Sequence, residues 1–244
     1  MSDARATLGP PDQPDGMPAT LRGRFRMTLA ELRRHAPFTL LGTVTGIILM
    51  LVLVMAAVPR SISESAFWTL HPLHVLLSAI VTAAMYRLHG GRGWWQILLV
   101  GYFGSVGLTT VSDSLIPFAG EWLLDLPRRG VHLGFVEKWW LVNPLALAGI
   151  AIGVAWPHTR VSHSAHVLLS TWASLFHLIM ALGGSLAWTL LPLVAVFLFL
   201  AVWVPCCTSD IVFPLLFLPR RSIRDVGAAR ARHEMPESMQ PEHK

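Results

Sequence analysis

Two matching pairs of histidines indicate transition-metal chemistry. The chain reads His71-Pro-Leu-His74-Val-Leu-Leu-Ser78 at one place and His163-Ser-Ala-His166-Val-Leu-Leu-Ser170 at another, with six of eight residues identical. Residues at positions i and i+3 share one face of a helix, and imidazole is a common ligand of divalent transition metals. We therefore predict a metal site at His74 and His166, supported by His71 and His163 nearer the membrane surface. The alternative is that these histidines only support helix packing.

Two aspartates stand alone in long apolar stretches. Asp113 is the only charged residue of 94–120, and Asp210 is the only charged residue of 186–218. A serine precedes each aspartate and a proline follows it four residues later, giving the supporting residues Ser112, Ser209, Pro117 and Pro214. Proline bends or ends a helix, and irregular backbone at membrane depth occurs only beside protein or a water-filled cavity. We predict that the third and sixth helices are broken and that both aspartates bind the metal. The alternative is that each carboxylate reaches interfacial water.

Further candidate ligands lie close to these aspartates or on the same helix face. Cys206 and Cys207 precede Asp210 by four and three residues, so one helix face can present a thiolate with the carboxylate. A cytoplasmic position keeps such thiols reduced, although a free cysteine also serves as a small apolar filler. His177 continues the stripe of His166 and is predicted to be a proton relay. Glu121, Glu137 and Lys138 are expected in a solvated outer loop, and His132 is expected to face water.

Composition places these residues in a membrane protein. The chain has 244 residues, of which 53% are hydrophobic and 14% are charged, against roughly 25% charged residues in an ordinary soluble domain. About 20 apolar residues suffice to cross a bilayer as a helix. The excess of basic residues lies in the two tails without interleaved aromatic residues, which argues against nucleic-acid binding. Six spans are predicted, at 36–59, 66–86, 94–111, 139–156, 164–182 and 186–205.

The distribution of Lys and Arg predicts the orientation of the spans. The tails and the turns at 87–92 and 157–163 together hold 15 Lys and Arg, whereas the loops after the first and third spans hold only Arg60, Arg128, Arg129 and Lys138. By the positive-inside rule, both termini are cytoplasmic and the protein is integral to the plasma (inner) membrane. Both tails, 1–34 and 219–244, are predicted to be disordered.

The matching motifs occur in the same order and predict an all-α membrane protein with an inverted repeat. Repeat one is 35–125, repeat two is 139–218, and the outer loop 126–138 joins them. A unit of three spans enters the membrane from the opposite side the second time, which is typical of secondary transporters. The first and fourth spans also share a Gly-x-x-x-Gly spacing, at Gly42 and Gly46 and at Gly149 and Gly153. Such faces allow close helix packing or a homo-oligomer.

Thr208-Ser209-Asp210 followed by Pro214 resembles a motif of a family of polytopic heavy-metal exporters assigned to manganese or arsenic efflux. The likeness covers about ten residues. That family usually has more spans and a Glu after the Asp, where this chain has Ile211. The resemblance implies metal export.

We therefore predict a secondary transporter of a divalent transition-metal cation, of the efflux type, working by alternating access without a required cofactor. The partners would be the lipid bilayer and the metal. One alternative is a membrane redox protein whose haem is held by His74 and His177, which fall at similar depth in their helices. A second alternative is a subunit of a larger membrane assembly that carries no active site.

Overall fold

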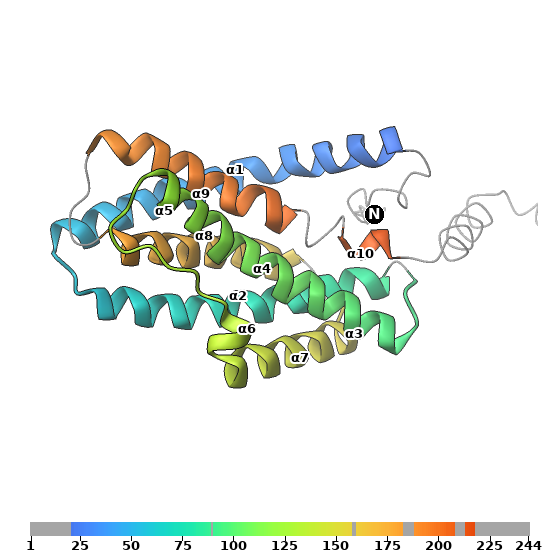
Figure 1. Cartoon of the computed structure of the whole chain (residues 1–244). Coiled ribbons are helices and arrows are strands. Elements are labelled where there is room, and N and C mark those ends of the chain that lie inside the picture. The colour runs from blue at the N-terminus through green and yellow to red at the C-terminus, as the bar shows by residue number, and fades with distance from the viewer. Residues whose placement is uncertain (1–20, 89, 158–159, 183–187, 208–212, 218–244) are drawn as a thin grey trace, which may run out of the picture.

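The fold is a bundle of helices. The structure, a computed structural model, describes residues 21–88, 90–157, 160–182, 188–207 and 213–217. All regular elements within these residues are helical, which confirms the all-α prediction (Figure 1). In chain order they are α1 (Leu21–Met55), α2 (Arg60–Leu88), α3 (Trp94–Tyr102), η1 (Phe103–Gly107), α4 (Leu108–Thr110), η2 (Val111–Leu115), α5 (Ile116–Leu123), α6 (Gly134–Glu137), α7 (Trp139–Ala155), α8 (Arg160–Ala181), η3 (Trp188–Leu190), α9 (Leu191–Cys207) and α10 (Phe213–Leu216).

The first helix begins earlier than the sequence predicts. α1 starts at Leu21, so the prediction of a disordered tail over 1–34 is wrong for 21–34. Its Pro-rich part ends at Pro18, and the residues that follow are mostly Leu, Arg, Met and Ala, which favour helix. The rest of that tail and all of 219–244 lie outside the described residues.

The third helix is not broken. From Trp94 to Leu123 the chain stays helical, and the strain is taken up by two wider π-helical segments, η1 and η2. Asp113 lies in η2 and Pro117 lies in the first turn of α5. Because proline has no N–H, the helix loses one backbone hydrogen bond at this turn. The backbone carbonyls of Ser112 and Asp113 contact Ser174 and His177 of α8. The break predicted in the sixth helix is at Asp210, which lies outside the described residues together with Ser209; Pro214 is buried in α10.

Helices of the two sequence halves pack across one another. α2 lies between α7 and α8 and contacts both extensively, whereas α1 packs on α8 and α9. Glycines permit two of these contacts. A Cβ at Gly149 would lie 2.5 Å from the carbonyl oxygen of Leu76 on α2, and a Cβ at Gly42 would lie 2.9 Å from Thr171 Oγ1 on α8. The Gly-x-x-x-Gly faces are therefore occupied inside the chain, and these surfaces are not available to a second copy.

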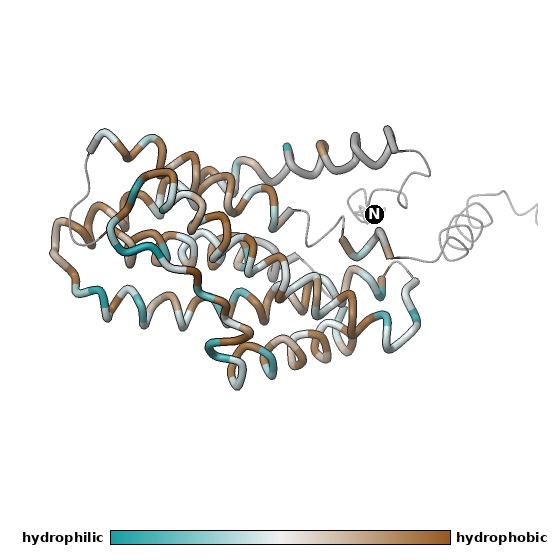
Figure 2. Tube along the Cα trace, viewed as in Figure 1, coloured by the Kyte–Doolittle hydropathy of each residue, from teal (hydrophilic) through white to brown (hydrophobic). Residues whose placement is uncertain are grey.

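Polar side chains are buried and large apolar side chains are exposed over much of the bundle. His74, Ser78 and Thr82 of α2 are all fully buried, while Leu41 and Ile48 of α1 are mostly exposed. In Figure 2, hydrophilic residues gather at the ends of the helices and near α6, with apolar residues along the middle. By length and composition, α2 is the one described helix that passes as a membrane span. Four further apolar stretches are shorter, at Thr39–Met55, Trp139–Ala155, Ala165–Ala181 and Leu191–Cys206.

Candidate metal centre

Asp113 and the first histidine pair form one buried cluster. His71 and His74 lie one turn apart on α2 and both face the third helix. Their Nδ1 atoms lie 2.9 and 2.7 Å from the same oxygen, Oδ2 of Asp113. All three side chains are fully buried. The i, i+3 spacing therefore brings both rings to one carboxylate, a contact that the sequence did not predict.

The carboxylate of Asp113 is fully engaged. Its Oδ1 accepts hydrogen bonds from Ser112 Oγ at 2.5 Å and from Ser170 Oγ at 3.2 Å. An ionised carboxylate only accepts, so His71 and His74 each donate an Nδ1–H to Oδ2. That arrangement leaves Nε2 of His74 with its lone pair. Asp113 is thus placed to orient a histidine ligand rather than to bind a metal directly, in contrast to the predicted role.

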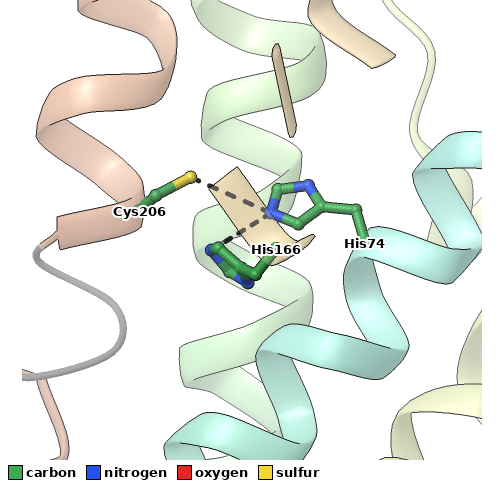
Figure 3. A group of neighbouring side chains, drawn as sticks. All are labelled: His74, His166 and Cys206. Carbon is green, nitrogen blue, oxygen red and sulfur yellow. Dashed lines mark hydrogen bonds between the residues drawn. The ribbon is translucent and has the colours of Figure 1, made fainter. Parts of the chain in front are cut away.

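His74 contacts His166 and a cysteine on its other side. Its Nε2 lies 3.3 Å from Nε2 of His166 on α8 and 3.8 Å from Sγ of Cys206 on α9. Figure 3 shows these three side chains converging from three helices. Their potential ligand atoms all lie within 4.8 Å of one another, and all three residues are buried. Cys206 also contacts Ser170, with its Sγ 3.2 Å from Oγ.

Imidazole and thiolate are ligands of tetrahedral transition-metal ions, and the spacing of the two imidazoles matches such an ion. Zinc sits about 2.0–2.1 Å from imidazole nitrogen, so two nitrogens on one tetrahedral ion lie about 3.3 Å apart. The separation between the two Nε2 atoms of His74 and His166 is 3.3 Å. The carboxylate of Asp113 behind His74 is the outer-shell partner that metal-binding histidines commonly have. Three protein ligands leave a fourth position open, as in sites that exchange their ligands.

His177 lies in a second cluster, away from this donor set. Its Nδ1 contacts the backbone oxygen of Asp113 at 2.7 Å. Its Nε2 contacts the backbone oxygen of Gly130 at 2.9 Å. His74 and His177 therefore point to different partners, and no observation favours a haem between them.

Glu121 is the functional candidate that sequence reasoning missed. The prediction of a solvated loop is wrong for this residue, because α5 extends the third helix and buries Glu121 completely. Its Oε1 lies 3.2 Å from His177 Nε2, and its Oε2 accepts the N–H of Gly130 at 3.1 Å. Glu137 is exposed as expected, whereas His132 is half-buried. The one available signal was a Glu directly after a long apolar stretch ending at Gly120.

Several predicted site residues lie outside what the structure describes. Asp210 and Ser209 are in the undescribed stretch 208–212. His163 and Cys207 belong to α8 and α9, but their side chains are not described. The predictions made for these four residues therefore stay predictions.

The comparisons with known proteins give no match. No family model matches the chain, and neither a curated protein nor a solved structure is similar to it. Function must therefore be argued from the site and from the architecture that holds it.

Proposed function

We propose that the protein is a secondary transporter of a divalent transition-metal cation, built from two inverted repeats of three membrane spans, with both termini in the cytoplasm. The observation that carries the proposal is the meeting of His74, His166 and Cys206. His74 comes from the first predicted repeat and the other two come from the second. An ion held there touches both repeats, so a movement of one repeat against the other would open the site. Alternating access needs that arrangement.

The surface of the bundle supports a lipid environment. Monomeric soluble proteins rarely expose large contiguous apolar patches, yet α1 and α9 line a wide apolar groove on the outside of the bundle with Val44, Ile48 and Val196. The polar residues that would be costly in lipid are buried instead, among them Thr39 and Thr43 on the inner face of α1. The 17 residues of α7 give about 26 Å of helix rise, close to the roughly 30 Å of a hydrocarbon core.

The packing of the helices supports the inverted repeat. A two-fold axis relating the repeats would pair the contact of α1 with α8 to the contact of α7 with α2, and both contacts occur. The glycine contacts follow the same relation. Gly42 meets Thr171, and Gly149 meets Ala79. The partners Thr171 and Ala79 differ by 171 − 79 = 92 positions, which is also the difference between His166 and His74.

The depth of the site supports transport. His74 lies 74 − 60 = 14 residues from the start of α2 and 88 − 74 = 14 residues from its end. It is therefore the middle residue of the helix with the clearest span character. Substrate sites of secondary transporters lie near the bilayer midplane.

The charges around the site support a divalent ion. A bound Cys206 is a thiolate, and Asp113 is an ionised acceptor of four hydrogen-bond donors. Together they carry two negative charges in a buried environment, where unbalanced charge is costly. A divalent cation balances them. Two imidazoles and a thiolate favour zinc or a similar ion over manganese, which prefers oxygen ligands.

Cobalt binding and zinc flux test the proposal on the full-length purified protein. Co²⁺ bound by Cys206 should give a thiolate-to-metal absorption band that disappears in Cys206→Ser. In liposomes, zinc flux should be lost in His74→Ala and His166→Ala. His233→Ala, in the predicted C-terminal tail, is the matched histidine control and should behave as wild type. Wild-type protein that binds cobalt without a thiolate band, or that moves zinc no faster than the two His→Ala variants, contradicts the proposal.

A further inference from the structure

A second buried cluster closes the end of the bundle at which α2 begins and α5 ends, here called the outer end after the predicted orientation. Glu121 of α5 and His177 of α8 lie side by side there, each with a side chain that is 1% exposed. The backbone of Gly130 joins both, since its N–H donates to Glu121 and its carbonyl contacts His177. An acid, a base and one loop residue are thus held together out of contact with water.

The contacts of His177 depend on its protonation state. Both ring nitrogens lie within hydrogen-bond distance of a backbone carbonyl, at 2.7 Å to Asp113 and 2.9 Å to Gly130. A carbonyl oxygen can only accept, and a neutral imidazole has a single N–H. Both contacts are therefore hydrogen bonds only when the ring carries both protons. The carboxylate of Glu121, 3.2 Å from Nε2, supplies the opposite charge. When the ring loses one proton, one of its two nitrogens can no longer donate a hydrogen bond to its carbonyl.

Ionisable side chains lead from this cluster to the surface. The ring of His132 lies 5.2 Å from the ring of His177, measured between centroids. His132 in turn lies 3.3 Å from Glu137, and their side chains are 21% and 40% exposed. Phe67 of α2 covers both rings at less than 6 Å. His132 is therefore an ionisable side chain that lies between the buried pair and the exposed Glu137.

The cluster is tied to the metal centre through Asp113. The backbone oxygen of Asp113 accepts from His177, while its carboxylate holds His74. His166 and His177 are separated by 177 − 166 = 11 residues of α8, or about 16 Å of helix rise. At that distance an imidazolium and a metal cation still repel each other in a weakly screened interior.

We infer that Glu121 and His177 form the proton-binding site that couples metal movement to an opposing proton movement. The inference rests on the proposed transport function. In the step, one proton from outer water binds the unprotonated nitrogen of His177, with Glu121 as its counter-ion. The same nitrogen releases that proton to inner water after the repeats have moved against each other. A proton on His177 weakens metal binding, and by linkage a bound metal weakens proton binding at His177 by the same factor. The other ionisable groups that act on the pair are Asp113 of η2, Arg60 of α2, and His132 and Arg129 of the loop.

Nitrogen NMR tests the proton site without reference to transport. With ¹⁵N-labelled histidine in detergent, His177 is assigned as the resonance lost in His177→Gln among the chain's 11 histidines. We expect His177 to show an imidazolium signal below neutral pH and Glu121→Gln to shift that titration to lower pH. Glu64→Gln, an exposed residue near the start of α2, is the matched control. A His177 that stays neutral down to pH 5, or an unchanged titration in Glu121→Gln, overturns the proton site.

Coupling is tested with zinc in liposomes that contain a pH-sensitive dye. A zinc gradient should drive an opposing proton movement in wild type and in Glu64→Gln. In Glu121→Gln the proton movement should be lost, while cobalt should still give the Cys206 thiolate band, because His74, His166 and Cys206 are all unchanged. A proton movement of wild-type size in Glu121→Gln contradicts the coupling role. Absence of zinc flux in wild type would defeat the transport proposal, and the NMR result would still decide on the proton site.

Discussion

The molecule holds two buried histidine clusters whose rings face different kinds of partner. At the metal centre, Nε2 of His74 faces another imidazole and a thiol, groups that can offer lone pairs. At the outer end, both ring nitrogens of His177 face backbone carbonyl oxygens. A ring nitrogen that donates a hydrogen bond to a carbonyl carries a proton and has no lone pair for a metal. The same residue type thus faces groups with lone pairs in one place and hydrogen-bond acceptors in the other. Under the two proposals, these partners determine whether a buried histidine binds a metal or a proton.

Asp113 takes part in both clusters with different atoms. Its side chain fixes the proton of His74 on Nδ1 and so frees Nε2 for a metal. Its backbone carbonyl accepts from His177. A change at the side chain and a change at the carbonyl should therefore affect different clusters, and the following variants separate the two.

Removal of a metal ligand should have the largest effect on metal affinity. His74→Ala or His166→Ala takes away one of three protein ligands, so zinc affinity should fall by more than about 100-fold, beyond the usual effect of outer-shell groups. His177→Ala should lower it by less than about tenfold, because that ring is not in the donor set. Competition with a chromophoric zinc chelator measures all three. Equal losses in His74→Ala and His177→Ala would mean that the two clusters do not differ in function.

Loss of the Asp113 charge should have the next largest effect. In Asp113→Asn, the neutral amide is a weaker acceptor for two histidines, and zinc affinity should fall about 10- to 100-fold. The ¹⁵N titration of His177 should shift less than it does in Glu121→Gln, because the backbone carbonyl of Asp113 is still present. The same chelator assay and NMR experiment report on both. An unchanged zinc affinity would show that Asp113 does not orient His74.

The sequence indicated the residues of the His74–His166–Cys206 cluster more clearly than those of the outer cluster. His74, His166 and Asp113 stand out because the motif repeats and because a charge is rare in an apolar stretch, and those patterns are visible without coordinates. Glu121 was assigned to a solvated loop because the apolar stretch ends one residue before it. Its burial depends on the continuation of the third helix past Pro117 and on the return of the loop at Gly130 over it.

Backbone groups explain the rest of the difference. Gly130 contributes only its N–H and its carbonyl, so its residue type gives no sign of a role. Pro117 was interpreted as a break, whereas the π-helical segment η2 carries the chain past it. The spacing of residues in an α-helix indicates which side chains share a face. A π-helical turn contains more residues, so the side chains after it lie on a different face from the one that the α-helical spacing predicts. The long apolar stretches of the sequence were enough to predict an all-α architecture. They were not enough to predict where the backbone carbonyls of Asp113 and Gly130 would lie.

A change at His132 should affect the rate of proton exchange and leave equilibria intact. His132 is half-buried between His177 and the exposed Glu137. In His132→Gln, the initial rate of zinc-driven proton movement should fall several-fold, since a glutamine does not titrate near neutral pH. The final pH inside the liposomes and the zinc affinity should match those of wild type. If the rate is unchanged, protons reach His177 by a route that does not include His132.

The smallest expected effect concerns the backbone at Pro117. In Pro117→Ala the chain regains an N–H in the turn that carries the carbonyls of Ser112 and Asp113, where it can compete with His177 Nδ1. The imidazolium form then loses part of one hydrogen bond, which is worth about 0.5–1.5 kcal/mol in full. The midpoint of the His177 titration should move to lower pH by at most about one unit, and zinc affinity should stay within about twofold because the side chain of Asp113 is unchanged. NMR and chelator competition on the same preparation measure the two quantities. A larger change in zinc affinity than in the His177 titration would mean that the backbone at Asp113 controls the metal centre as well, and the separation between its two roles would not hold.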